Sequence, residues 1–392
     1  METPSFRLDG SWGPVRGAAP ARVLTWTEGD PGDPFELLQA AVRRDDYRIA
    51  VGYLGYDLGR QVERIEDRAH DRLEIPDLWV GFWDHVADGP AIGKERSDPG
   101  PLPVAAGPPR PTLPRARYLE AVRSLRERLA AGDLYQANLT QRITVPLEAG
   151  GDPQTLYETL LTPHPSAFAC YLDCGSFQIV GASPERFLAF DPATRLLRTE
   201  PIKGTAPAGR LAELLASDKD RAEHVMIVDL ERNDLGRVCE PGTVRVQGML
   251  RSMDLPGLHH LVTTVEGRTR IGIGLADMLR ATFPGGSITG APKVAAMQLI
   301  EELEPVRRGV YCGAVGWFRP DGAFDLGLAI RTAVVRNDEL HVHAGGGVVM
   351  DSTPEGEHDE CWLKARRFLE AVGASADHSS RERSARQVPP PS

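Results

Sequence analysis

The 392-residue sequence lacks the features that would indicate a membrane span, a disulfide framework or a nucleic-acid surface. It has no run of about 18 apolar residues, the length that a membrane span needs. Its five cysteines are scattered without a CxxC pair, which is typical of reduced thiols rather than of disulfides or a zinc site. The net charge of −10 argues against nucleic acid as a partner, because phosphate binding needs an excess of Lys and Arg.

Other absences narrow the class of protein further. Residues 1–17 have no apolar core of the kind found in a secretory leader. The chain contains no internal repeat and no phosphate loop of the GxxxxGKS kind. The composition is otherwise ordinary for a globular protein, with 41% hydrophobic and 26% charged residues. We therefore expect a cytoplasmic protein that is an enzyme by its size.

Short strands, turns rich in glycine and proline, and a few helices alternate along the chain. Apolar residues recur at helical spacing in residues 34–43, 117–131 and 210–233, and again after Pro354. Together these signals predict an α+β fold with mostly antiparallel sheets. We divide the chain into an N-terminal portion at 1–100, a linker loop at 101–115, a catalytic region at 116–374 and a disordered tail at 375–392.

The segment RTEPIKGT at 198–205 ends a strand abruptly. Pro201 removes a donor from the strand ladder, so the strand is an edge or bends there. Gly204 allows the backbone to pass close to another group. Lys203, between them, is either an ordinary surface charge or a nucleophilic amine, and the local sequence leaves both interpretations open.

Two helical segments each carry a pair of acids on one face. Asp220 and Glu223 are three residues apart in the first, as are Glu357 and Glu360 in the helix after Pro354. Each pair is either a solvated stripe or, if the helices face each other, part of a Mg²⁺ site made of oxygen ligands.

Two amides lie on one face of the strand predicted at 134–145, Gln136 and Asn138. Buried amides need hydrogen-bond partners. These two are therefore either structural or contacts to a substrate.

Longer motifs resemble the chorismate-utilising enzymes, a family that includes the large chains of anthranilate, aminodeoxychorismate, isochorismate and salicylate synthases. The resemblance runs from about residue 118 to 372, and more faintly through GYLGYD at 52–57. The motifs are DLYQANL at 133–139, SPERF at 183–187, EHVMIVDLERND at 223–234, HLV at 260–262, FPGGSITGAPK at 283–293, RGVYCG at 308–313, AIR at 329–331 and AGGGVV at 344–349. The resemblance implies two large antiparallel sheets packed as a sandwich, with helices outside and chorismate as the substrate.

The resemblance also implies a reaction. Aminodeoxychorismate synthases have a lysine at the position of Lys203, where anthranilate synthases have alanine. This lysine would attack C2 of chorismate as the C4 hydroxyl leaves, and ammonia would then enter at C4 and give 4-amino-4-deoxychorismate. Glu200 resembles the acid that protonates the departing hydroxyl, although strand parity places it opposite Lys203 unless Pro201 bends the strand. The ammonia would come from a separate glutamine amidotransferase subunit.

Binding roles follow by resemblance as well. Glu223 and Glu360 correspond to direct Mg²⁺ ligands, and Asp220 and Glu357 to ligands through water. The enolpyruvyl carboxylate of chorismate would be held by the guanidinium of Arg331 and by Tyr311. His260 would lie near the reacting ring. The residues implied at the substrate are Arg331, Tyr311, His260, Gly204, Thr205, Thr289, Gly345, Gly346, Gly347 and Lys364.

Some positions depart from other members of the family. Gln136 stands where salicylate and isochorismate synthases have a lysine that activates water, so we expect ammonia as the nucleophile. Residues 165–167 are Pro-Ser-Ala where tryptophan-regulated anthranilate synthases have Pro-Tyr-Met, and no Leu-Leu-Glu-Ser segment lies near the N-terminus, so we do not expect tryptophan feedback. The rival interpretations are the large chain of an anthranilate synthase and a chorismate-binding regulatory subunit that has lost its chemistry.

Overall fold

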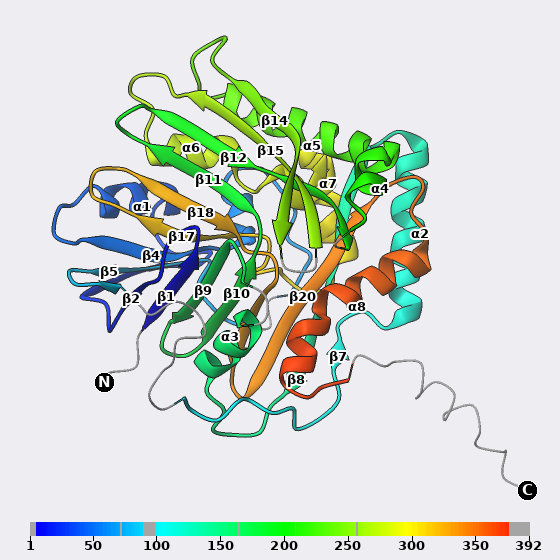
Figure 1. The fold of residues 1–392 in the computed structure, drawn as a ribbon, viewed down its shortest axis with the longest axis horizontal. Helices are drawn as coiled ribbons and strands as arrows, with labels where there is room; N and C mark the ends of the chain where they lie inside the picture. Colours follow the sequence, from blue (N-terminus) through cyan, green and yellow to red (C-terminus); the bar gives the residue numbers. More distant parts are fainter. Residues whose placement is uncertain are drawn as a thin grey trace, which may run out of the picture.

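The computed structural model describes residues 5–70, 73–88, 99–162, 165–207, 209–255 and 258–375. Within these residues the chain forms an α+β fold of two ten-stranded antiparallel sheets, which confirms the predicted fold class (Figure 1). The expected tail, from residue 376 on, lies outside the described residues, as do the side chains of Thr205 and Asp220. None of the described helices is both long and apolar enough to cross a membrane.

The first sheet combines strands from both ends of the chain. Its strands are β1 (Phe6–Gly10), β2 (Val15–Gly17), β6 (Ala87–Asp88), β7 (Arg110–Pro111), β8 (Gln136–Pro146), β9 (Phe168–Asp173), β10 (Gln178–Ser183), β16 (Gly290–Ala291), β19 (Thr332–Arg336) and β20 (Glu339–Val348). Their order is β16-β8-β20-β19-β10-β9-β1-β2-β6, and β7 also pairs with β8. The predicted strand at 134–145 is therefore β8, next to β20, which holds the three consecutive glycines.

The second sheet is built in the same way. Its strands are β3 (Arg22–Trp26), β4 (Ile49–Leu54), β5 (Leu78–Trp83), β11 (Arg186–Asp191), β12 (Leu196–Glu200), β13 (Ile202–Pro207), β14 (Arg245–Leu255), β15 (Leu258–Arg268), β17 (Ala314–Phe318) and β18 (Phe324–Leu328). Their order is β13-β15-β12-β11-β18-β17-β4-β5-β3, and β14 also pairs with β15. Strands β12 and β13 are interrupted only at Pro201 and both pair with β15.

Helices cover the outer face of each sheet (Figure 1). They are α1 (Pro34–Val42), α2 (Arg115–Ala131), α3 (Pro153–Leu161), α4 (Leu211–Ala216), α5 (Asp218–Gly236), α6 (Leu275–Thr282), α7 (Lys293–Leu303) and α8 (Pro354–Ala371), with short 3-10 turns η1 (Tyr56–Gln61) and η2 (Gly286–Ile288). One apolar cluster joins the first sheet to α2, α3, α7 and α8, and another joins the second sheet to α1, α5 and α6.

A third apolar cluster fills the space between the two sheets. It includes Cys170 and Leu172 of β9 together with Val51 and Tyr53 of β4. The alternate residues of β9, such as Tyr171, belong to the helix-covered cluster on the other face. This alternation, with both faces of a strand buried, gives four layers in the order helix, sheet, sheet, helix.

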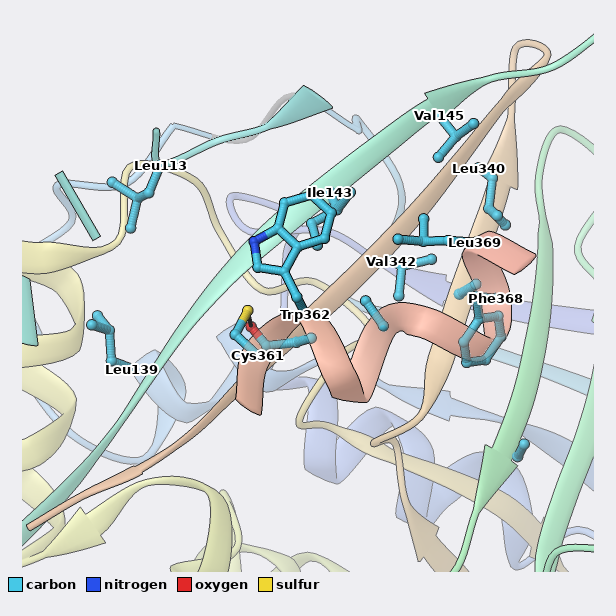
Figure 2. Packing of buried hydrophobic residues seen from close by; sticks show 14 of the residues in the cluster. Leu113, Leu139, Ile143, Val145, Leu340, Val342, Cys361, Trp362, Phe368 and Leu369 are labelled. Carbon is cyan, nitrogen blue, oxygen red and sulfur yellow. Dashed lines mark hydrogen bonds between the residues drawn. The ribbon is translucent and has the colours of Figure 1, made fainter. Parts of the chain in front are cut away.

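Helix α8 begins as the sequence predicts. Thr353 is its N-cap and accepts a hydrogen bond from the backbone N–H of Gly356 at 3.2 Å, and Pro354 occupies the first turn, where its missing N–H costs nothing. The apolar face of α8, with Trp362, Phe368 and Leu369, packs on strands β8 and β20 (Figure 2). The orientation of α8 over β20 is thus fixed by its apolar face.

Leu369 should contribute far more to stability than Leu363 on the same helix. Leu369 is fully buried and Leu363 is 55% exposed. We expect Leu369→Ala to lower the free energy of unfolding by about 2–5 kcal/mol, because it leaves a cavity in a packed core. Leu363→Ala should change it by about 0.5 kcal/mol or less. Chemical denaturation of both variants measures this, and equal losses would show that α8 does not pack as described.

Candidate active site

Ser287 connects groups from both sheets. Its backbone carbonyl accepts hydrogen bonds from Asn138 Nδ2 at 3.2 Å and from Lys203 Nζ at 3.3 Å. Its hydroxyl donates to Glu185 Oε1 at 2.7 Å. Asn138 belongs to β8 of the first sheet and Lys203 to β13 of the second, so the buried turn at Ser287 fixes how these two strands are placed at the site.

A bulge in β13 presents Lys203. The register between β13 and β15 shifts between Lys203 and Thr205, and Gly204 in between has a φ of 82°. Such a left-handed conformation is strained for any residue with a Cβ, and glycine in a bulge tolerates it. Gly204 therefore serves the local backbone geometry that positions the lysine.

The surroundings of Lys203 favour its neutral form. Burial lowers the pKa of Lys203, and repulsion from Lys364 lowers it further, while Glu185, Glu223 and Glu360 oppose these two effects. The pKa of this amine is lower than that of an ordinary lysine as a result. A lysine with a lowered pKa has more of the unprotonated amine that nucleophilic attack needs.

Glu185 is the buried carboxyl beside this amine. It is 5% exposed, and burial raises its pKa to about 7 even though Ser287, Lys203 and the backbone of Ile202 stabilise the charged form. A carboxyl with a pKa near 7 holds a proton in a large fraction of molecules at neutral pH, as a general acid requires.

The structure corrects the expectation for Glu200. Thr199 points to α5, where its hydroxyl donates to Glu231, so Glu200 lies on the opposite face of the strand. There Glu200 pairs with Arg186 and accepts a hydrogen bond from Thr264 at 3.0 Å. It lines a separate cavity of about 230 Å³. Pro201 does not bring Glu200 round to Lys203, and Glu185 takes the place expected of it.

The predicted carboxylates of α5 and α8 face the same lysine. Both Glu223 and Glu360 influence the pKa of Lys203. Burial alone would raise the pKa of Glu360, but the positive charges of Lys364, Lys203 and Arg331 outweigh it and lower that pKa. Lys364 Nζ lies 2.5 Å from Glu360 Oε1. Carboxylates from both helices therefore act on the same lysine.

Gly346 leaves room in front of these carboxylates. A Cβ placed on Gly346 would lie 3.1 Å from Glu357 Oε2, 3.2 Å from Glu360 Oε1 and 3.4 Å from Lys364 Nζ. Its neighbours have another function: a Cβ on Gly345 would collide with the backbone of β8, and one on Gly347 with the amide of Gln136. Gly346 thus faces the site, and the other two glycines also allow close packing of the strands, while the expected contacts of all three with the substrate stay predictions.

Arg331, Tyr311 and His260 complete the polar side of the site. Arg331 has a φ of 50° and donates from one guanidinium nitrogen to the backbone carbonyl of Lys364 at 2.8 Å. The ring of Tyr311 stacks on that of His343 with centroids 5.3 Å apart. Burial lowers the pKa of His260, and the charge of Arg331 adds to the effect, so the surroundings of His260 favour its neutral form.

Two groups of polar residues make hydrogen bonds within the protein. Gln136 Nε2 donates to Asn138 Oδ1 at 3.2 Å and Asn138 continues to Ser287, while Gln136 Oε1 is buried without a hydrogen-bond partner among the described residues. Thr289 is fully buried and its hydroxyl donates to the carbonyl of Gly285 at 2.9 Å. Thr289 is thus hydrogen-bonded within its own loop, and its expected contact with the substrate stays a prediction.

The roles of Glu185 and Ser287 were not found from the sequence. Glu185 lies in the SPERF motif and Ser287 in the FPGGSITGAPK motif, but neither motif predicts which strands its residues contact in the folded chain. Arg186 pairs with Glu200 in the register of β11 and β12. This register shows that Glu185, the residue before Arg186, lies on the same face of the sheet as Lys203.

Comparisons with known proteins agree with this geometry. A family model described as chorismate binding enzyme matches residues 8–370. Anthranilate synthase component 1 of Thermus thermophilus is 42% identical over 358 residues, which cover 82% of this chain and 77% of that protein. Aminodeoxychorismate synthase component 1 of Klebsiella aerogenes is 39% identical over 349 residues, which cover 82% and 76%. The crystal structure of anthranilate synthase component I from Streptococcus pneumoniae superposes with a TM-score of 0.80 and 28% identity, over 94% of this chain and 93% of that one.

Replacing Glu185 and Glu200 separately tests which one is the acid. We expect Glu185→Gln to lower the kcat for chorismate consumption by about 10²- to 10⁴-fold, the usual contribution of a general acid. Glu200→Gln should have a much smaller effect. In the wild type, activity should fall as the pH rises through about 7, where Glu185 loses its proton. This decrease in the pH–activity profile should be absent in Glu185→Gln. A larger loss in Glu200→Gln would contradict the assignment.

Proposed function

This chain belongs to the family of chorismate-binding enzymes, and on that premise we propose that it joins ammonia to chorismate to form 4-amino-4-deoxychorismate. Relatives named for two different products are similar to it to nearly the same degree. The choice between the products therefore depends on the chemistry of the site. The observation that carries it is Lys203, whose pKa is lowered beside a carboxyl whose pKa is raised.

The proposed reaction consists of two displacements. In the first, the neutral amine of Lys203 forms a bond to C2, the C4–O bond breaks, and water leaves with the proton of Glu185. In the second, ammonia forms a bond to C4, the bond from C2 to the lysine nitrogen breaks, and Lys203 leaves as a neutral amine. The product then carries an ammonium group at C4, and Glu185 is left without its proton.

The substrate's two carboxylates have separate binding groups in this proposal. Arg331 and Tyr311 hold the enolpyruvyl carboxylate, because a guanidinium forms paired hydrogen bonds with a carboxylate. The conformation of Arg331, held by its bond to the carbonyl of Lys364, orients that guanidinium. Lys364 and the backbone around Gly346 lie on the same side of the site.

The ring carboxylate is assigned to a magnesium site. The described residues contain no ready-made group of three metal-binding side chains, but Glu357 and Glu360 converge in front of Gly346 and Glu223 faces the same lysine. These oxygen ligands fit Mg²⁺, which keeps several waters and takes one or two carboxylates directly. Glu223 and Glu360 would bind the ion directly, and Asp220 and Glu357 through water. When bound, Mg²⁺ supplies the positive charge that holds and orients the ring carboxylate.

Ammonia is proposed to come from a separate glutamine amidotransferase subunit. In the absence of that subunit, a high concentration of an ammonium salt should replace it. Glutamine alone should not support the reaction.

Product identification tests the proposed function directly. With chorismate, ammonium and Mg²⁺, we expect 4-amino-4-deoxychorismate by mass spectrometry and no pyruvate. Lys203→Ala should lower the rate at least as far as Glu185→Gln, because it removes the nucleophile. Lys203→Met, which fills the space without an amine, is the matched control and should lose the same activity. Anthranilate and pyruvate released together by the wild type would overturn the proposal.

The magnesium assignment makes a separate prediction. Glu360→Gln should weaken Mg²⁺ binding by at least about tenfold, because a direct ligand loses its charge. Glu370→Gln, on the same helix in an exposed ion pair with Arg366, should leave binding unchanged. Calorimetric titration with Mg²⁺ and thermal unfolding of both variants separate a loss of ligand from a loss of fold. Equal Mg²⁺ affinity in both variants would exclude Glu360 as a ligand.

A further inference from the structure

A second buried carboxyl, Glu231, adjoins the same Gly286-Ser287 turn as Glu185. Glu231 is on α5 and is 7% exposed, and it accepts a hydrogen bond from the hydroxyl of Thr199. Its Cγ is 3.7 Å from the position that a Cβ on Gly286 would occupy, and Gly286 precedes the serine that binds Glu185. Glu231 has no role in substrate binding or in the two displacements.

Polar groups beside Glu231 lie towards the surface. The titratable groups whose charges act on Glu231 are Glu185, Asp234 and Lys293. Asp234 Oδ2 accepts from Lys293 Nζ at 2.7 Å, and the side chain of Lys293 is 11% exposed. A cavity of about 10 Å³ lies among Thr199, Glu231, Asp234 and Thr282, which is at the lower limit of the space that one water molecule needs.

Glu231 holds its proton at neutral pH. Burial raises the pKa of Glu231 to about 8, the charges of Glu185 and Asp234 add to this effect, and Thr199 and Lys293 oppose it. The pKa of Glu185 is raised to about 7. Burial therefore favours the protonated form of both carboxyls.

The proposed reaction creates a need for such a proton. Neutral ammonia enters, the hydroxyl leaves as water with the proton of Glu185, and the product leaves as an ammonium ion. Each turnover therefore takes up one proton from solvent, and Glu185 is the group that must recover it. Glu185 is buried, so recovery needs either water from the emptied site or a route through the protein.

We propose that Glu231 returns this proton to Glu185 between turnovers. The O–H bond of Glu231 breaks as that of Glu185 forms, and Glu231 then regains a proton from solvent along the side of Asp234 and Lys293. Glu231 is thus a positioning residue, because it acts through Glu185 and does not touch the substrate. The inference depends on the proposed function, since only the addition of neutral ammonia leaves Glu185 unprotonated.

Comparing the first turnover with later turnovers tests this role. Glu231→Gln keeps the size and polarity of the side chain but cannot release a proton. Rapid-quench measurements with enzyme in excess over chorismate should give a first turnover within about twofold of the wild type, because Glu185 starts protonated. The steady-state rate should fall by at least about tenfold, after a burst of one product per site. The solvent deuterium isotope effect on kcat should increase in the variant.

Two further variants serve as controls. Glu231→Asp retains a carboxyl and should recover part of the steady-state rate. Glu240→Gln alters an acid that forms surface ion pairs with Arg195 and Arg268 and should behave as the wild type. Circular dichroism and thermal unfolding verify that each variant is folded. If Glu231→Gln does not fold, the comparison of Glu231→Asp with the wild type still tests the role of Glu231.

The outcomes distinguish this inference from the proposed function. Equal losses in the first and later turnovers, or an unchanged steady-state rate in Glu231→Gln, would overturn the return of the proton while leaving the product assignment intact. No recovery in a folded Glu231→Asp would also overturn it. Anthranilate as the wild-type product would instead overturn the proposed function.

Discussion

The hydrogen bonds of Ser287 hold together groups that come from both sheets. Its carbonyl binds Asn138 of the first sheet and Lys203 of the second, and its hydroxyl binds Glu185. A nucleophile and an acid on different strands act together only when their separation is held within a fraction of an ångström. The turn at Ser287 is buried between the sheets and supplies that constraint, so the geometry of the site depends on how the two sheets pack.

Burial has opposite effects on the two reactive groups. It lowers the pKa of Lys203 and raises the pKa of Glu185, because a poorly solvated site disfavours the charged form of either group. Burial therefore favours the neutral form of both the amine and the carboxyl. Glu223 of α5 and Glu360 of α8 limit how far the pKa of Lys203 is lowered. They also provide the negative charge that would hold a cation.

Local sequence patterns were sufficient for several of the elements. The apolar spacing after Pro354 predicts α8, and the alternation before Pro146 predicts β8, because these signals reflect contacts that each element makes with its own layer. The acids of α5 and α8 were paired only through the family resemblance, since no local pattern states that Glu223 and Glu360, 137 positions apart in the sequence, belong to one site.

The correction for Glu200 depended on strand register. Glu200 is near Lys203 in the sequence but lies on the other face of the strand, and Glu185 is 18 positions away yet shares its face. Glu231 looks like one charge in a charged stretch of helix, and only its burial against Thr199 distinguishes it from the exposed acid Asp229. Pairing and burial are properties of the folded chain, so the sequence pattern could not supply them.

The central claim is that Lys203 becomes covalently attached to the substrate. Intact-protein mass spectrometry of enzyme mixed with chorismate and Mg²⁺, without ammonia, and quenched in acid measures this most directly. The account predicts an added mass equal to chorismate less one water, located on Lys203 by peptide digestion and absent from Lys203→Ala. An enzyme that forms product when ammonia is added, but shows no adduct at Lys203 under these conditions, would contradict it.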